Sequence, residues 1–179
     1  MKTNVAMRID LAQVRQKPYS WQETVEVDAS ELGRDELLAL GPIDWSGRVT
    51  FADPDFYLRA RLEYEQTLAC HRCLKPVVEA VETDVELMLE VGGEQPMAGE
   101  HELGEGDLGV VQVDSDDFDP RPVLIEQLQL AVPMKPLCRD DCKGLCPHCG
   151  ADRNDGDCDC KDEWVDPRWA ALEKLKTGE

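Results

Sequence analysis

Cysteine is the residue type in this chain best suited to chemistry, and its eight copies fall into four close pairs. One to three residues separate the members of a pair, and turn-forming residues such as Lys143-Gly144 and Gly150 stand beside them. A zinc ion takes four soft ligands in a tetrahedron, and a tight turn lets one segment supply two of them. We therefore predict two structural zinc ions, each held by four thiolates. The predicted ligands are Cys146, Cys149, Cys158, Cys160, Cys70, Cys73, Cys138 and Cys142.

Two groupings of the four pairs into two sites are favoured by the sequence. In the first grouping, the last two pairs form a compact site, since they lie within 15 residues of each other. The first two pairs then meet across the fold. In the competing grouping, the second and third pairs share an ion, and the fourth pair joins the first.

Four thiolates close the coordination shell of zinc, whereas a catalytic zinc keeps one position open for water or substrate. This ligand set therefore favours a structural role. A redox role for Cys70-x-x-Cys73 would require a strand-to-helix junction, where the helix N-terminus lowers the thiol pKa. Both flanks predict strands instead, and Pro76 follows closely. Because the sequence also has no phosphate loop, HExxH motif or nucleophile elbow, we expect no enzyme and no small-molecule substrate.

Short alternating runs predict strands over much of the first half of the chain. Residues near 3–10, 20–28, 46–52 and 56–68 carry Val, Thr, Tyr and Phe in such runs. The longest run is Val77–Val91, where apolar side chains alternate with mostly acidic ones. Period two over this length predicts a long strand with one wet, negative face.

Helix signals are fewer. Ser30–Leu40 resembles a short helix that Gly41-Pro42 would end. Asp119-Pro120 is typical of a helix start, and apolar residues at helical spacing follow it until Pro133. Asp166-Pro167 begins a second pattern of this kind near the C-terminal end. Together these elements predict an α+β fold: a mainly antiparallel sheet, open or barrel-like, with a few helices and a Cys-rich zinc-binding C-terminal segment.

Charge divides the chain unevenly. Its 179 residues include 38 acidic and 19 basic side chains, a net charge of −19, and residues 81–120 hold 13 acidic and no basic ones. We expect 1–137 to form the α+β core, with an acidic strand and loop at 81–120. We expect 138–179 to form a Cys-rich tail with a C-terminal helix. Broad coating of nucleic acid or of an anionic membrane needs excess Lys and Arg, so it is not expected here.

The sequence also predicts a soluble, cytoplasmic protein. No apolar run approaches the roughly 18 residues that a membrane-spanning helix needs. Residues Met1–Val14 place Lys2, Arg8 and Asp10 among their apolar residues, which argues against the hydrophobic centre of a signal peptide. A cytoplasmic location keeps thiols reduced, so metal ligation is expected in place of disulfides.

Longer stretches around the cysteines carry a further signal: Leu68–Pro76 with its Cys-His-Arg-Cys turn, Leu130–Pro133, Cys138–Gly150, Asn154–Cys160 and Asp166–Leu172. Together these stretches resemble the bacterial YceD family, whose members are described as large ribosomal RNA subunit accumulation proteins. They follow the family's order from the strand at 56–68 to the C-terminal end, and the resemblance is weakest over 1–45. It implies a role in ribosome biogenesis and rRNA accumulation, and it supplies no catalytic residues.

An acidic chain that serves ribosomal RNA is most simply explained by contact with a basic ribosomal protein or assembly factor. Residues 81–120 would then steer the partner through complementary charge. The same stretch is equally well explained as a solvated sheet face and loop that keep the protein soluble.

Direct contact with 23S rRNA is the alternative, because basic residues stand on or beside the cysteine turns. Stacking of bases on Trp164 and Trp169 would add to it. Acidic residues interleave with the basic ones, which weakens this alternative, and a redox or RNA-processing enzyme is the least favoured class. The basic residues are Arg72, Lys75, Arg139, Lys143 and Arg153, together with Lys135, Lys161 and Arg168.

Overall fold

The computed structural model describes residues 7–92, 109–160 and 168. Its main element is a six-stranded sheet in the order β2-β4-β5-β6-β7, with β3 paired to β5 beside this path. The strands of this sheet are β2 (Tyr19–Val25), β3 (Leu37–Leu40), β4 (Ile43–Ala52), β5 (Asp55–Ala69), β6 (Pro76–Val91) and β7 (Val110–Val113). All pairings in it are antiparallel except that of β6 with β7.

The smaller elements pack around one end and one face of this sheet. Strands β1 (Ile9–Asp10) and β8 (Asp117–Phe118) form a separate two-stranded pair. The helices are α1 (Leu11–Val14), a 3-10 helix (Ala29–Leu32) and α2 (Arg121–Ala131). None of the helices in the described part of the chain is long and apolar enough to cross a membrane.

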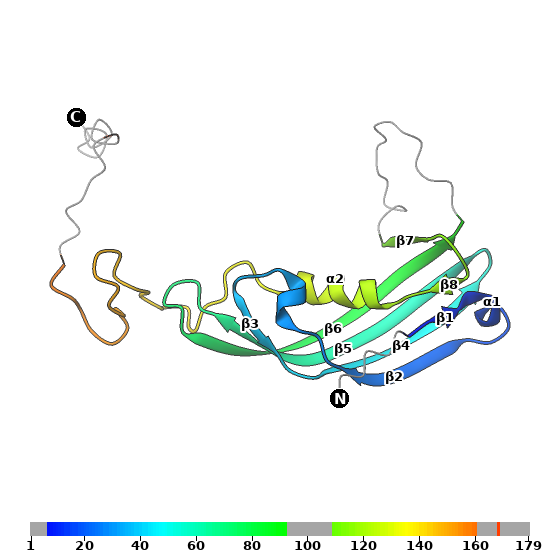
Figure 1. Cartoon of the computed structure of the whole chain (residues 1–179), viewed down its shortest axis with the longest axis horizontal. Coiled ribbons are helices and arrows are strands. Elements are labelled where there is room, and N and C mark those ends of the chain that lie inside the picture. Colours follow the sequence, from blue (N-terminus) through cyan, green and yellow to red (C-terminus); the bar gives the residue numbers. More distant parts are fainter. Residues whose placement is uncertain (1–6, 93–108, 161–167, 169–179) are drawn as a thin grey trace.

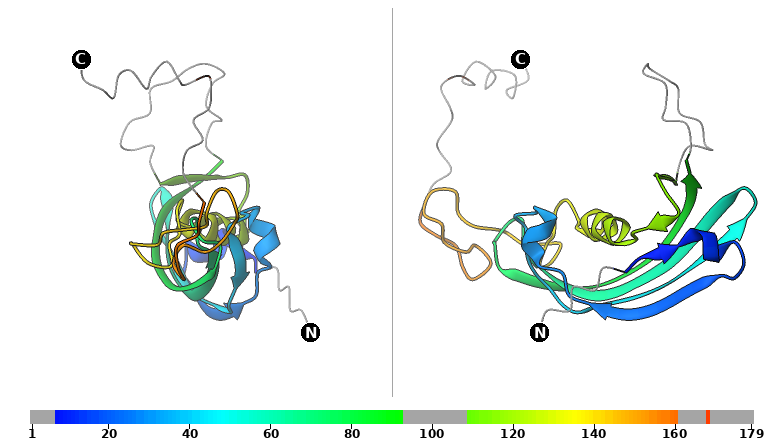
Figure 2. Two further views of the ribbon diagram at one scale, coloured as in Figure 1. Left: turned by 90° about the vertical axis from the view of Figure 1, so that its left-hand side faces the viewer. Right: turned by 45° about the vertical axis from the view of Figure 1, so that its right-hand side comes forward.

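The sheet is curved, and α2 lies in its hollow (Figure 1). Seen along its length, the strands bend partway around the helix (Figure 2). Val123, Leu124 and Leu128 on α2 are buried in one cluster with Phe56 and Leu58 of β5. The helix begins where expected: Pro120 precedes it, and the Asp119 carboxylate accepts a hydrogen bond from the N–H of Arg121 at 2.9 Å.

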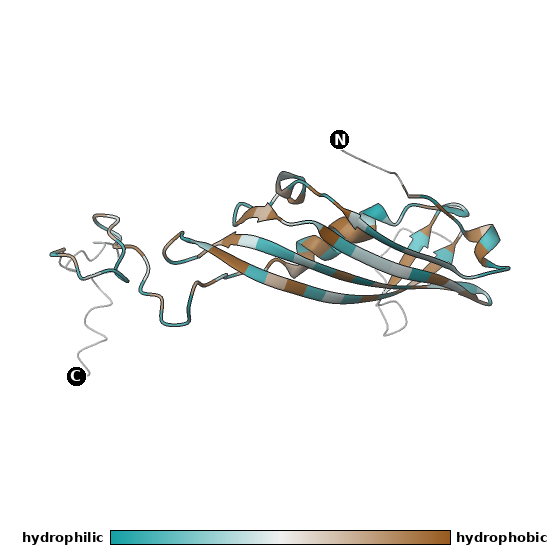
Figure 3. Cartoon of the chain, turned by 90° about the horizontal axis from the view of Figure 1, so that it is seen from below, coloured by the Kyte–Doolittle hydropathy of each residue, from teal (hydrophilic) through white to brown (hydrophobic). Residues whose placement is uncertain are grey.

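Buried and exposed side chains alternate along β5 and β6, which gives the sheet a buried face and a solvent-facing one. Every second residue of β5 from Phe56 to Leu68 is buried, while the residues between them face water. Glu82, Asp84, Glu86 and Glu90 of β6 lie on the outer, convex face, as the period-two pattern predicts. Glu79 is on the other face, where it accepts a hydrogen bond from the buried Gln66 at 3.0 Å. Bands of opposite hydropathy therefore alternate along the long strands when the sheet is seen from below (Figure 3).

The structure corrects two expectations, and two others fall almost entirely outside the described residues. The sheet is open, so the barrel-like option is wrong: β7 has only four residues, it pairs with the last residues of β6, and α2 occupies the hollow. The predicted helix over Ser30–Leu40 is also wrong, because only 29–32 is helical and Leu37–Leu40 pairs with β5. The two others are the loop predicted within 81–120 and the helix predicted after Asp166-Pro167.

Gly47 of β4 gives a first test of this packing. A Cβ at this position would lie 2.2 Å from Cζ2 of Trp21, whose ring also packs edge-on against Trp45 at 5.4 Å. Gly47→Ala is expected to lower the free energy of unfolding by about 1–3 kcal/mol, the usual cost of overpacking. Chemical denaturation measures it. If the clash is the cause, adding Trp21→Leu recovers part of the loss, whereas additive effects of the two substitutions would contradict it.

Candidate metal centres

The first cluster of thiols joins the β5–β6 hairpin to the segment that follows α2. Cys70 and Cys73 lie in the turn between the two strands, and Cys138 and Cys142 come from the segment after the helix. The Sγ atoms of Cys70 and Cys142 are 3.8 Å apart, and those of Cys73 and Cys138 are 3.7 Å apart. Four sulfurs at 2.3 Å from a tetrahedral ion lie about 3.8 Å from one another. A disulfide would need about 2.05 Å. The spacing therefore suits a shared ion.

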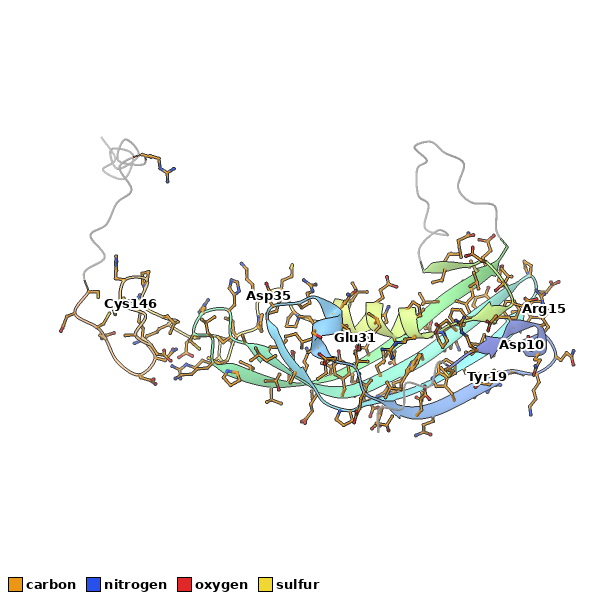
Figure 4. All side chains as sticks on the ribbon, viewed as in Figure 1. Asp10, Arg15, Tyr19, Glu31, Asp35 and Cys146 are labelled. Atoms are coloured by element: carbon orange, nitrogen blue, oxygen red, sulfur yellow. The ribbon has the colours of Figure 1, made fainter. Side chains whose placement is uncertain are left out.

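The second cluster lies in the tail, at the opposite end of the molecule from Asp10 and Arg15, as the label on Cys146 shows (Figure 4). Its four ligand atoms lie within 4.8 Å of one another, as do those of the first cluster. Its members are Cys146, Cys149, Cys158 and Cys160. The structure thus brings the thiols together in the first of the two groupings considered from the sequence. Two groups of four cysteines that could hold a metal ion are present in the described residues.

The two clusters differ in burial. In the first, Cys70, Cys73 and Cys142 are buried and only Cys138 is exposed. In the second, Cys149 and Cys160 are both exposed. An ion in the second cluster would therefore be more open to solvent and to chelators.

Both clusters begin with the same turn. The N–H of Leu74 donates to the carbonyl of Cys70 at 2.9 Å, and the N–H of Gly150 donates to the carbonyl of Cys146 at the same distance. In each turn the first cysteine N–H donates to the carbonyl five residues later, at 2.9 and 2.8 Å. Leu74 and Gly150 occupy the same position of the turn, with φ of 60° and 73°. Each turn thus presents two sulfurs on one side of a closed loop.

The positive φ at Gly150 carries a prediction. No atom lies within 4 Å of a Cβ placed there, so Gly150→Ala tests the backbone conformation alone. We expect metal affinity at the second cluster to fall roughly fivefold, because a left-handed conformation costs alanine about 1 kcal/mol. Gly150→Asn is the matched control, since Asn tolerates this conformation, and it should keep most of the affinity. Equal losses in both variants, measured by competition with a chromophoric chelator, would contradict this explanation.

Hydrogen bonds to sulfur distribute the charge unequally within each cluster. Burial raises the pKa of the Cys70 thiol, but N–H donors of Cys73, Cys138 and Arg72 outweigh it and bring that pKa to about 6. The N–H groups of Cys149 and His148 likewise lower the pKa of Cys146 to about 6.

Neighbouring sulfurs have the opposite effect and raise the pKa of other thiols in the cluster. Burial, and then hydrogen bonds with the other thiols of the cluster, raise the pKa of Cys138 to about 12. A hydrogen bond with Cys149, followed by burial, raises the pKa of Cys160 to about 12. Thiolates that lie this close together disfavour one another's ionisation, so a cation is needed to hold all four sulfurs of a cluster ionised.

Backbone contacts dock the tail on the hairpin beside the first cluster. The carbonyl of Arg72 accepts from the N–H of Leu145 at 3.0 Å, and the N–H of His71 donates to the carbonyl of Pro136 at 2.7 Å. The Arg72 guanidinium reaches across and donates to the carbonyl of Cys142 at 2.8 Å. Gly144, with φ of 71°, lies so close that a Cβ would be 2.8 Å from the Arg72 carbonyl oxygen.

Three of the basic residues singled out for RNA contact have partners inside the protein. Arg72 donates to backbone carbonyls of the tail. Lys75 pairs with Asp152 at 2.7 Å and with Asp155 at 3.2 Å, and these carboxylates raise its pKa. Arg139 pairs with Asp141 at 3.2 Å. The side chains of Lys143, Arg153 and Lys135 have no ion pair within the described residues, and Lys161, Trp164 and Trp169 lie outside them.

Sequence reasoning missed two residues that support the first cluster. Asn154 donates through Nδ2 to Cys142 Sγ at 3.4 Å, and Asp152 holds both Asn154 and Lys75. The sequence marked this stretch only as a turn before Cys158. Composition alone could have indicated these two residues, because Asp and Asn near a predicted thiolate site are suited to orient hydrogen-bond donors toward sulfur.

Comparison with known proteins agrees with the resemblance found in the sequence. The model of the YceD family, described as large ribosomal RNA subunit accumulation protein YceD, matches residues 58–176. The chain is 27% identical over 175 residues to an uncharacterized protein of Mycobacterium tuberculosis, covering 94% of this chain and 81% of that one.

A second relative is the uncharacterized protein YlbN of Bacillus subtilis, 27% identical over 166 residues and 92% of both chains. The comparison with solved structures gave no match. The matched region begins within β5 and spans both cysteine clusters, so the residues that form the candidate metal centres lie inside the family's own segment. The chain belongs to the YceD family of large ribosomal RNA subunit accumulation proteins.

Proposed function

We propose that this chain is a non-catalytic factor that acts in large-subunit rRNA accumulation by binding a basic ribosomal protein or assembly factor. Membership of the YceD family supports the ribosomal role. Two closed sets of four cysteines support a structural use of metal, because neither set leaves a position for a reacting group.

Zinc fits the donor sets of both clusters. Soft thiolates select zinc among the common divalent ions. In the first cluster, sulfur spacings of 3.7 and 3.8 Å suit the tetrahedral geometry of zinc. In the second cluster, the four ligand atoms lie within 4.8 Å of one another. The first ion would be held by Cys70, Cys73, Cys138 and Cys142, and the second by Cys146, Cys149, Cys158 and Cys160. When bound, zinc would supply a cross-link: it would fasten the tail to the hairpin and close the tail's own loop.

The charge of the convex face of the sheet favours binding of a positively charged partner. Asp44, Glu63 and Glu82 lie directly opposite one another on β4, β5 and β6. Like charges in this register oppose sheet formation, so the row is not there for stability. Arg61 contacts Glu63 at 2.7 Å and also Glu82 and Asp84, which offsets part of the repulsion. Carboxylates outnumber arginines on this face, so it retains negative charge.

The observation that carries the proposal is the pairing of basic groups. The chain has a net charge of −19, and Arg72, Lys75 and Arg139 are engaged by carbonyls and carboxylates of the same molecule. RNA phosphates would have to compete with those partners. A basic protein would meet complementary charge on the convex face, where carboxylates are in excess over arginines.

The test compares binding of two probes by the purified chain: isolated large-subunit ribosomal proteins and deproteinised large-subunit rRNA, each at low and at high salt. We expect capture of one or more basic proteins and no retention of rRNA above background. Retention of rRNA with a steep salt dependence and no protein capture would contradict the proposal and favour direct phosphate contact.

A charge variant identifies the surface. Asp44→Asn/Glu65→Gln/Glu82→Gln removes three charges from the convex face and leaves Glu63 and Asp84 for Arg61. We expect the association rate with the captured protein to fall roughly tenfold at low salt and to match the unmodified chain at high salt. The control, Glu26→Gln/Asp35→Asn/Glu126→Gln, removes the same charge elsewhere. If both variants slow association equally, net charge and not this face is responsible.

A further inference from the structure

The loop that carries the second cluster also contacts the first one. Asn154 lies in sequence between Cys149 and Cys158, yet its Nδ2 donates to Sγ of Cys142, a member of the first cluster, at 3.4 Å. Its Oδ1 accepts from the N–H of Lys143 at 2.8 Å and from Nη2 of Arg139 at 2.8 Å. A single amide thus contacts a thiol, a backbone N–H and a basic side chain of the tail segment that carries Cys138 and Cys142.

Asp152 fixes the orientation of that amide. Its Oδ1 accepts from the N–H of Asn154 at 2.9 Å and from Nδ2 at 2.7 Å. Its Oδ2 lies 2.7 Å from Nζ of Lys75, which stands two residues after Cys73 on the hairpin. The contacts therefore run from the hairpin through Asp152 and Asn154 to Cys142, and all of the intermediate groups come from the second cluster's loop.

The backbone of this loop is tied to the same place. The N–H of Arg153 donates to the carbonyl of Gly144 at 2.9 Å, and Leu145 forms an isolated β-bridge with Asp152. Outside these contacts the loop is closed by the second cluster itself, whose pairs stand on either side of Asn154. An N–H group aimed at a ligand sulfur stabilises the thiolate and orients it for the metal. An ion held by the second cluster would keep the loop closed and Asn154 in this position.

We propose that the two clusters bind metal cooperatively, with Asn154 as the positioning residue that couples them. An ion in the second cluster closes the loop at 150–157 and sets Asn154 against Cys142, which raises the affinity of the first cluster. This inference rests on the proposed use of both clusters as zinc sites. Because coupling free energies are reciprocal, an ion in the first cluster raises the affinity of the second by the same factor.

The difference in burial between the clusters determines which ion a chelator removes first. Cys149 and Cys160 are exposed, whereas three of the four thiols in the first cluster are buried. A chelator reaches the second ion first, and its removal releases Asn154 and weakens the buried site. Metal loss from the tail would thereby loosen the attachment of the tail to the sheet.

The test uses Co²⁺ as the spectroscopic probe on the reduced full-length chain. Two single-site variants isolate the clusters: Cys146→Ser/Cys149→Ser keeps the first, and Cys70→Ser/Cys73→Ser keeps the second. Each isolated cluster is expected to bind roughly 10–100-fold more weakly than in the intact chain, the range of effects seen for outer-shell partners. The reductions must be equal for the two clusters.

Asn154→Ala tests the coupling residue without removing a ligand. In the intact chain it should weaken Co²⁺ binding at the first cluster about tenfold. In the Cys146→Ser/Cys149→Ser background it should change nothing, because Asn154 is already released there. Arg153→Ala is the control: its side chain has no ion pair within the described residues, and its backbone hydrogen bond to Gly144 remains.

The outcomes separate this inference from the proposed function. Two Co²⁺ ions bound with affinities that are the same in the intact chain and in the single-site variants would overturn the coupling and leave the zinc sites standing. An effect of Asn154→Ala that persists unchanged without the second cluster would also overturn it. Failure of the unmodified chain to bind Co²⁺ through thiolates would overturn the zinc proposal itself.

Discussion

A chain with Cys142→Ser is expected to keep its sheet folded but to lose the attachment of its tail. Cys142 is a buried member of the first cluster, and its carbonyl also receives the Arg72 guanidinium. Affinity at the first cluster should fall at least about 100-fold, since outer-shell partners alone are worth 10–100-fold. Metal content of the isolated protein should drop from two ions per chain to one.

The sheet should survive because its core is separate from the cluster. The large buried group joins the strands to α2, whereas Cys70, Cys73 and Cys142 form a second, small group with Leu137 and Leu145 beside it. Limited proteolysis with mass spectrometry should therefore find new cleavage between residues 133 and 145, together with an unchanged far-UV spectrum. Cys160→Ser, which removes an exposed thiol of the other cluster, is the matched comparison and should produce much less cleavage there. Equal resistance of Cys142→Ser and unmodified protein would show that the first cluster does not hold the tail.

Gly144→Ala should detach the tail without touching a cysteine. Two effects add: alanine pays about 1–2 kcal/mol for a φ of 71°, and its Cβ would lie 2.8 Å from the Arg72 carbonyl oxygen. Because the obstructing atom belongs to the backbone, no side-chain rotation relieves the contact. The neighbouring hydrogen bond from Leu145 to Arg72 is then lost as well, for a total of roughly 2–4 kcal/mol of docking free energy.

The expected readout is hydrogen exchange at the amides of Leu145 and His71, which should accelerate by one to three orders of magnitude at 1.4 kcal/mol per tenfold. Gly156→Ala is the control, since Gly156 has open space around it and belongs to the same tail. It should leave both amides protected. Protection in Gly144→Ala that equals the control would mean that the tail is not docked at this point.

The sequence was informative where a pattern is local. Period two along Val77–Val91 and the proline-initiated helix before Pro133 were both predicted, and β6 and α2 confirm them. These elements are fixed by alternation and by capping, which operate within a few residues. The spacing of the cysteine pairs likewise indicated two four-thiol groups, because close pairs can face one ion.

The expectations that failed depended on distant partners. Residues 37–40 have the composition of a helix, yet they form β3 because the end of β5 extends beyond β4 and offers unpaired backbone groups there. Closure of the sheet depended on what fills its hollow, and α2 fills it. The support that Asn154 gives to Cys142 could not be predicted, since it joins a loop of one cluster to a ligand of the other.

The central claim is that both groups of thiols bind a metal ion. Its most direct test is zinc analysis of the intact chain, purified under reducing conditions. Two zinc ions per chain, with all eight thiols unreactive toward alkylating reagent until a strong chelator is added, are the predicted result. A chain that carries no zinc and alkylates at all eight cysteines at once would contradict it.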